Sequence, residues 1–116
     1  MQTVFHVSSP DPGDQQHAMV NALNLLADNS VSSSADDVAI VANGAGVRMF
    51  VTETASNRDM VDTLREQDVT LLACRNSLDG MGATDADLLP GVEEAPSGSG
   101  ALARFQDEGY GYIKAP

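Results

Sequence analysis

Cys74 is the only cysteine in the chain, and it ends an apolar run that begins at residue 69. A single cysteine cannot form a disulfide within the chain, so a thioredoxin-like dithiol cycle is excluded. The thiol can pack as a small hydrophobic group, or it can act as a nucleophile, become oxidised or carry sulfur as a persulfide. In open α/β sheets, reacting groups gather beyond the carboxyl ends of the strands. Cys74 is therefore the leading candidate for a reactive residue.

The residues that follow Cys74 favour a reactive thiol over a purely structural one. Arg75 supplies a positive charge and Asn76 supplies amide donors. A helix is expected to begin just beyond them. These features stabilise a thiolate relative to a thiol.

The loop Gly44-Ala45-Gly46 follows another apolar run and must be compared with a dinucleotide-binding fingerprint. Met49 stands where that fingerprint needs its third glycine, so the pattern is broken. Two interpretations remain: a tight strand exit that uses the freedom of glycine, or a backbone surface that lines a pocket. No phosphate-binding loop motif is present, and no cofactor is predicted.

The histidines and serines are weaker candidates for metal binding or catalysis than Cys74. His6 and His17 lack the spacing to Cys74 or to each other that a zinc site needs, so no metal is predicted. His6 is expected to be a satisfied polar residue in a strand near the sheet edge, and His17 to lie on a solvated helix face. Ser8 and Ser9 lack a nucleophile elbow and are expected to be turn residues.

Strand-like and helix-like segments alternate along the chain. Strands are predicted over residues 2–8, 37–42, 69–73, 91–95 and 110–113, and helices over 14–29, from 56 onward, 85–89 and 101–108. Residues 30–34 and 96–100 are predicted to be a loop and a turn, and 47–51 either a helical turn or a strand. The first three helices are expected to begin at Asp14, at a Ser56–Asp59 capping box and at Thr84. The last helix is expected to end at Gly109.

This alternation predicts a three-layer α/β sandwich with a mostly parallel central sheet. The run over residues 37–42 is continuously apolar, as expected for a central strand buried on both faces. The 116 residues are enough for one domain with its own core, so residues 1–116 are predicted to form a single domain.

The net charge limits the kinds of partner that the protein is expected to bind. Seventeen acidic residues against six basic ones give a net charge of −11, and Lys114 is the only lysine. Such a surface repels phosphate backbones and anionic lipid, so neither nucleic-acid nor membrane binding is expected. Dispersed acidic residues with scarce lysine are typical of proteins adapted to high salt, although an ordinary acidic protein has a similar composition. The single cysteine and the lack of signal-peptide features predict a cytoplasmic location.

The chain resembles the DsrE/DsrF-like family of small α/β proteins associated with sulfur relay. The resemblance extends over nearly the whole length and rests on an ordered set of segments, at residues 3–7, 21–26, 38–44, 72–78, 87–92 and 99–110. An alanine–cysteine pair at a strand end, Ala73-Cys74, belongs to this set.

The resemblance implies a flavodoxin-like three-layer fold and a homo-oligomer, a trimer or hexamer. It implies that Cys74 accepts sulfane sulfur from a donor protein and passes it to an acceptor. Asn76 and the Asn43-Gly44 loop would line the same pocket. Two interpretations remain open: a sulfurtransferase-like carrier with a persulfide on Cys74, and a non-catalytic oligomeric module of the same fold that binds a small ligand or protein and has a structural cysteine.

Overall fold

Strands and helices alternate in the structure, a computed structural model that describes residues 1–33 and 35–116. Ser34, the last residue of the predicted serine-rich loop, lies outside the described residues. In chain order the elements are β1 (Gln2–Val7), α1 (Pro12–Ala27), β2 (Asp37–Ala42), the 3-10 helix η1 (Gly44–Phe50), α2 (Arg58–Glu66), β3 (Thr70–Cys74), α3 (Arg75–Gly80), the 3-10 helix η2 (Asp85–Asp87), β4 (Val92–Ala95), α4 (Gly98–Asp107) and β5 (Gly111–Lys114).

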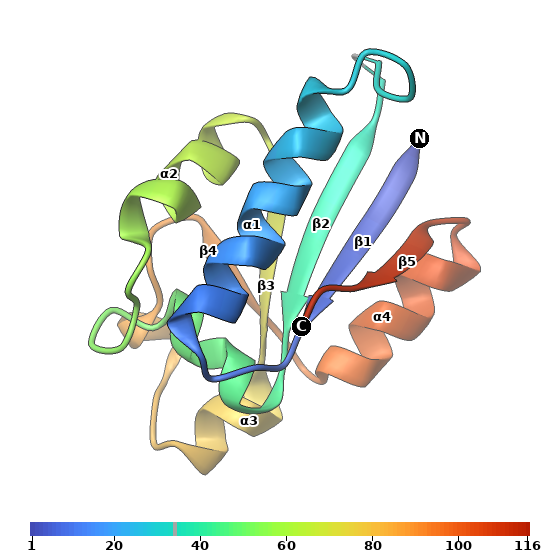
Figure 1. The fold of residues 1–116 in the computed structure, drawn as a ribbon. Helices are drawn as coiled ribbons and strands as arrows, with labels where there is room; N and C mark the ends of the chain where they lie inside the picture. Colours follow the sequence, from blue (N-terminus) through green and yellow to red (C-terminus); the bar gives the residue numbers. More distant parts are fainter. Residues whose placement is uncertain (34) are drawn as a thin grey trace.

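The strands form one sheet in the order β4-β3-β2-β1-β5, and every pair within it is parallel (Figure 1). The register aligns Val7 with Ala42, Ala42 with Ala73, and Cys74 with Ala95, so the carboxyl ends of four strands lie at one edge. The predicted three-layer α/β sandwich is confirmed. The layering is that of flavodoxin-like folds, although the strand order differs from that of flavodoxin itself.

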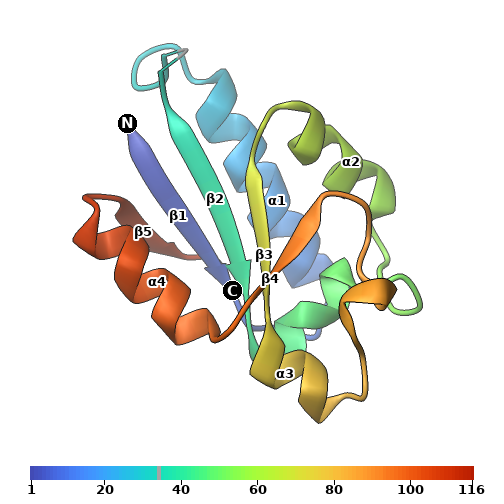
Figure 2. The same cartoon turned by 180° about the vertical axis from the view of Figure 1, so that it is seen from behind.

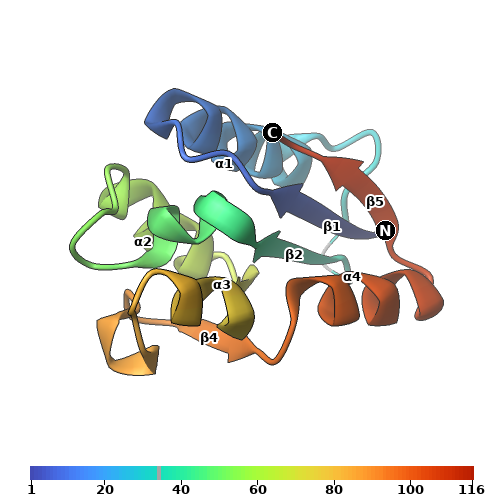
Figure 3. The ribbon, with the colours of Figure 1, turned by 90° about the horizontal axis from the view of Figure 1, so that it is seen from below.

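Helices cover the two faces of the sheet unequally. Figure 3 views the sheet from its carboxyl ends, with α1 and α2 on one side and α4 on the other. The larger core lies against the first face and contains Ile40, Met19 and Phe50, each fully buried. A smaller core lies beneath α4 and consists of Val4, Ala39, Val41 and Leu102.

The α4 face is open over part of its width. Figure 2 shows α4 crossing the β1–β5 side of the sheet, with β3 and β4 beside it. Within the described residues, no helix lies in front of β3 and β4 on this face, and Leu72 of β3 is only half-buried. Among the same residues, no helix is long and apolar enough to cross a membrane.

The first helix begins earlier than Asp14. Asp11 is the N-cap, and its side chain accepts hydrogen bonds from the backbone N–H groups of Gly13 (2.7 Å) and Asp14 (3.0 Å). Pro12 occupies the first helical turn, where its missing N–H has no helical partner to lose. Pro12 and Gly13, although both are typical turn formers, therefore belong to the first turn of the helix.

The capping box expected at Ser56 and Asp59 is wrong. Asn57 precedes α2 and makes no side-chain capping bond, so α2 depends on the burial of Val61 and Leu64. Thr84 is the N-cap of η2, as predicted, and it forms a capping box with Asp87 that the sequence analysis did not predict; η2 ends at Asp87 rather than at Leu89.

Two further boundaries differ from the prediction. The ambiguous segment 47–51 lies mostly in η1, which already starts at Gly44. The turn predicted at 96–100 is the first turn of α4, because the Ser97 hydroxyl accepts a hydrogen bond from Gly100 N–H at 2.9 Å and caps the helix.

Candidate functional site at the end of β3

Cys74 is the last residue of β3, and its side chain is enclosed. Its exposed fraction is 5%, and its thiol is free. Ala95 of β4 is its register partner, and α3 begins at the next residue. The sulfur therefore lies at the carboxyl edge of the sheet, where the sequence predicted it.

The sulfur is surrounded by hydrogen-bond donors from two segments. The Ser77 hydroxyl and the backbone N–H groups of Asn76 and Ser77 come from the first turn of α3. A further backbone N–H comes from Gly98, at the start of α4. Most of these donors belong to the backbone, so the fold itself fixes them.

The Ser77 hydroxyl is oriented by a third segment. The backbone N–H of Gly44, at the exit of β2, donates to Ser77 Oγ at 2.7 Å. Because this bond occupies a lone pair of the oxygen, the hydroxyl hydrogen is free to point toward the sulfur. Gly44 thereby supports a donor to Cys74, and its φ of 54° lies in the region that favours glycine.

These contacts change the acidity of the thiol. Burial acts to raise the pKa of Cys74, and it is the largest single influence. Hydrogen bonds from the Ser77 hydroxyl and from the backbone N–H groups together have a larger effect than burial. The pKa of Cys74 therefore lies below its ordinary value. The arrangement favours a thiolate, which is the nucleophilic form of cysteine.

Gly98 can reach the sulfur only because it has no side chain. A Cβ at this position would lie 2.8 Å from Cβ of Asn43 and 3.3 Å from Cβ of Cys74. The start of α4 is thus in close contact with both residues. This approach brings the Gly98 N–H to the thiol.

Asn43 is oriented by His6. Nε2 of His6 lies 2.7 Å from Oδ1 of Asn43, and Nδ1 of His6 lies 2.7 Å from the hydroxyl of Tyr112. Since the amide oxygen accepts, Nε2 carries the proton and Nδ1 accepts from the tyrosine hydroxyl. The amide nitrogen of Asn43 is then turned away from β1. His6 is a satisfied polar residue as predicted, in the strand next to the edge strand β5.

Arg75 is adjacent in sequence but directed elsewhere. Its guanidinium forms an ion pair with the carboxylate of Glu94 in β4, and the side chain is about half exposed. The donors around the sulfur do not include it. Of the candidate residues, the structure therefore brings Cys74, Asn43, Gly44 and Asn76 together and turns Arg75 toward β4.

Two residues of the site were missed by the sequence reasoning, Ser77 and Gly98. Ser77 stands three residues after Cys74. This spacing brings the Ser77 side chain back to the sulfur only if a helix begins directly after the strand. Gly98 carried no comparable signal, because its role depends on where α4 lies in the fold.

The chain matches a known protein family over almost its whole length. The family model described as DsrE/DsrF-like family matches residues 1–115. The chain belongs to the DsrE/DsrF-like family. A search of curated protein sequences finds no match.

Solved structures agree with the family. A protein of unknown function from Methanobacterium thermoautotrophicum, MTH1491, is 32% identical, and the match covers 97% of each chain with a TM-score of 0.88. The ychN protein from E. coli shares the fold with a TM-score of 0.76 at 19% identity, over 98% of this chain and 99% of that one. The DsrE/DsrF-like family is associated with sulfur relay.

The histidines of this family member do not assemble a metal centre with Cys74. Within residues 1–33 and 35–116, no group of three His, Cys, Asp or Glu side chains could hold a metal ion. His17 is exposed on α1, as predicted for a solvated helix face.

Proposed function

We propose that this protein is a sulfur carrier that accepts sulfane sulfur as a persulfide on Cys74. The observation that carries the proposal is the set of donors around the thiol, which lowers its pKa despite its burial. A thiolate is the form that attacks sulfur, and a lowered pKa increases the share of the thiolate at a given pH.

The transfer proceeds without net oxidation or reduction. The Cys74 thiolate attacks the outer sulfur of a donor persulfide, the donor's sulfur–sulfur bond breaks, and the donor leaves as a thiolate. An acceptor thiolate then attacks the outer sulfur of the Cys74 persulfide and regenerates Cys74. Ser77 and the start of α4 hold the charge on the cysteine sulfur before the first step and after the second.

Burial favours a second candidate function. Cys74 is 5% exposed, which suits a structural cysteine in an oligomeric module that binds a small ligand or a protein without catalysis. In that case Asn43, Gly44 and Asn76 would contribute to ligand binding, and replacement of the thiol would leave affinity unchanged.

Intact mass after sulfur loading separates the two functions. The reduced protein is incubated with thiosulfate, or with a cysteine desulfurase and cysteine. We expect one added sulfur atom on the wild type and none on Cys74→Ser. A Cys74→Ser/Ser99→Cys variant keeps one cysteine, now at an exposed position of α4, and should load far more slowly. No adduct on the wild type, or equal loading of the relocated cysteine, contradicts the carrier function.

We further propose the setting in which the carrier works. Residues 1–116 act as one domain in a homo-oligomer, a trimer or hexamer, in the cytoplasm of a cell with high internal salt. Its partners are proteins that donate and accept sulfur, and neither nucleic acid nor membrane is among them. The net charge of −11 supports the high-salt setting and the last exclusion.

A further inference from the structure

A row of polar side chains crosses the sheet near its carboxyl edge. It extends from β5 over β1 to the ends of β2 and β3, and its members are Tyr112, His6, Asn43 and Cys74. The first three are linked by hydrogen bonds, from the Tyr112 hydroxyl to Nδ1 of His6 and from Nε2 of His6 to Oδ1 of Asn43, each at 2.7 Å. Tyr112 is 42% exposed, whereas His6 and Asn43 are half-buried. The row therefore connects the molecular surface with the thiol.

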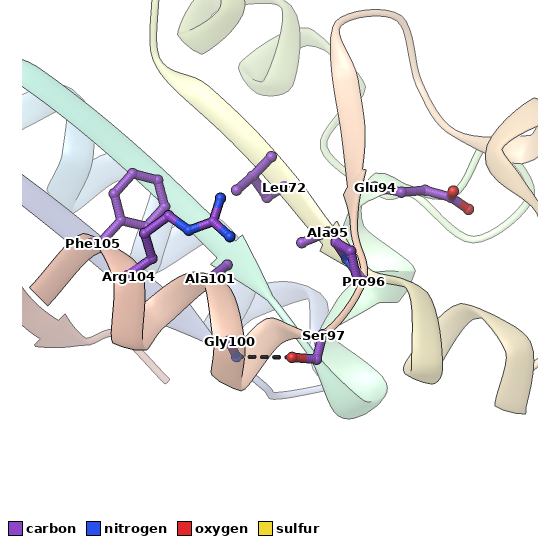
Figure 4. Close-up of a pocket in the computed structure, with 9 residues that line it drawn as sticks. All are labelled: Leu72, Glu94, Ala95, Pro96, Ser97, Gly100, Ala101, Arg104 and Phe105. Atoms are coloured by element: carbon purple, nitrogen blue, oxygen red, sulfur yellow. Dashed lines mark hydrogen bonds between the residues drawn. The ribbon is translucent and has the colours of Figure 1, made fainter. Parts of the chain in front are cut away.

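Asn43 and Cys74 lie on the sheet face that α4 covers. Val41 belongs to the core beneath α4, and Asn43, two residues further along an extended backbone, faces the same side. Leu72 lines a groove together with residues of α4 (Figure 4), which places Cys74, two residues further along β3, on this face too. The two side chains are thus neighbours at the ends of two paired strands.

The start of α4 brings the amide group of Asn43 close to the thiol. A Cβ placed on Gly98 would lie 3.5 Å from Cγ of Asn43 and 3.3 Å from Cβ of Cys74. Both side chains therefore surround the same point. The side chain of Asn43 is nevertheless not among the donors to the sulfur of Cys74. It is a polar group beside that sulfur rather than bonded to it.

The bond to His6 leaves the amide nitrogen of Asn43 available. Because Oδ1 accepts from His6 on the β1 side, the NH2 group occupies the branch of the amide that is turned away from β1. Cys74 belongs to β3, the other neighbour of β2. Among residues 1–33 and 35–116, no acceptor is bonded to this nitrogen, which is not a fully buried atom. Two N–H bonds are thus free for a ligand at the thiol.

A persulfide needs a donor at a place where a thiolate does not. The donors from Asn76, Ser77 and Gly98 meet Sγ of Cys74, which stays in place when the residue is loaded. The added sulfur lies about 2 Å beyond Sγ, and it carries the negative charge of an ionised persulfide. A donor beside the thiol, rather than on it, is therefore suited to the outer sulfur.

We propose that Asn43 is a further residue of the sulfur site, whose amide N–H donates to the outer sulfur of the Cys74 persulfide. His6 and Tyr112 are positioning residues that hold this amide in the required orientation. The Tyr112 hydroxyl donates to Nδ1 of His6, so the ring proton stays on Nε2 and fixes Oδ1 of Asn43. The assignment rests on the proposed sulfur-carrier function.

Loading from thiosulfate makes this donor measurable. The Cys74 thiolate attacks the outer sulfur of thiosulfate, the sulfur–sulfur bond breaks, and sulfite leaves with the electron pair. The charge of the thiolate is then on the outer sulfur of the persulfide, so atoms, electrons and charge balance. A donor that bonds only this outer sulfur raises the loading equilibrium and leaves the pKa of the free thiol unchanged.

Asn43→Ala should lower the equilibrium constant for loading at least about tenfold, as expected for the loss of a hydrogen bond to a charged group. Intact mass at fixed concentrations of thiosulfate and sulfite measures this constant. The pKa of the free Cys74 thiol should stay that of the wild type, because Asn43 is not among its donors. Asn43→Asp keeps an oxygen for His6 but has no N–H, and should load no better than Asn43→Ala. Asn24→Ala, at an exposed position of α1, is the matched control and should load like the wild type.

Tyr112→Phe tests the positioning role at an exposed position. Without the hydroxyl, the proton of His6 can move to Nδ1, and Asn43 can turn its NH2 group toward Nε2. We expect the nitrogen NMR shifts of His6 to report a mixture of tautomers, and the loading constant to fall at least about threefold. Tyr110→Phe removes a hydroxyl that lies near Asp37 instead of His6, and should change neither measurement.

The outcomes separate this assignment from the carrier function. If the wild type loads, and Asn43→Ala or Asn43→Asp loads equally well, the role of Asn43 is overturned and the carrier function stands. The role is also overturned if the pKa of the free thiol rises in Asn43→Ala, because the substitution then acts on Sγ. If the wild type loads neither from thiosulfate nor from a cysteine desulfurase, the carrier function and the role of Asn43 are both overturned.

Circular dichroism and the melting temperature establish that each variant is folded. Loading of Tyr112→Phe equal to that of the wild type overturns the positioning role. If Asn43→Ala does not fold, Tyr112→Phe decides the whole assignment, because it leaves Asn43 and Cys74 in place.

Discussion

At the scale of single residues, the acidity of Cys74 depends on one replaceable side chain. The other donors to its sulfur are backbone N–H groups of Asn76, Ser77 and Gly98, which substitution cannot remove without moving the chain. Ser77 contributes its hydroxyl, and Gly44 orients that hydroxyl. The contribution of the hydroxyl can therefore be isolated by mutation.

Ser77→Ala should raise the pKa of Cys74, because the burial that disfavours the thiolate remains while one donor to it is lost. A titration of the ultraviolet absorbance of the thiolate measures this directly and does not depend on reagent access. Ser99→Ala removes an exposed hydroxyl from the same protein and is the matched control. Titration curves that coincide for Ser77→Ala and the wild type would contradict the assigned role.

The same shift has a defined effect on stability. A cysteine whose pKa is lowered in the folded state stabilises that state above the unfolded pKa, and the contribution is lost as the pH falls through the folded pKa. The difference in unfolding free energy between wild type and Ser77→Ala should therefore be larger at alkaline than at acidic pH.

The sequence identified part of the site because strand ends are readable from apolar runs. Cys74, Asn43 and Gly44 follow two such runs, and neighbouring parallel strands bring their ends together. The direction of Arg75 was not predictable, since it depends on Glu94 in a strand that is paired only in the folded sheet.

At the scale of elements, the position of α4 controls the site. The helix starts at Gly98 because Ser97 caps it, and this brings the first turn against Asn43 and Cys74. The prediction placed this turn outside the helix, since two glycines and a proline within 96–100 are typical turn formers. The capping serine among them was the decisive residue.

Gly98→Ala should destabilise the protein by about 1–3 kcal/mol, the usual cost of inserting a methyl group into a packed position. The added Cβ would lie 2.8 Å from Cβ of Asn43, so α4 or Asn43 must move. Urea unfolding measures the change. Gly80→Ala is the control, because a Cβ there meets nothing within 4 Å. Equal stabilities of the two variants would contradict the close packing of α4 on the site.

At the scale of the whole molecule, the acidic surface works against the compact state. The charge of −11 is spread along the chain, and self-repulsion between like charges is screened by salt. Several acidic side chains have no compensating partner: Glu53, Glu66 and Glu93 are exposed and form no ion pair among the described residues.

Salt should therefore stabilise this protein. Raising KCl from about 0.01 M to about 1 M shortens the Debye length from roughly 30 Å to roughly 3 Å, and we expect the melting temperature to rise. The triple variant Glu53→Gln, Glu66→Gln and Glu93→Gln should be more stable at low salt and should gain less from added KCl. A salt response identical to that of the wild type would show that charge repulsion is not the cause.

The sulfur of Cys74 is held by segments that are far apart in the chain, since Gly44, Ser77 and Gly98 meet only after the sheet has formed. A chain still emerging from the ribosome has not yet joined α4 to β3. Its cysteine then keeps an ordinary pKa of about 8.5 and is mostly protonated at neutral pH. The lowered pKa of this thiol is therefore a property of the completed fold, because the donor from Gly98 is in place only when the last helix has docked.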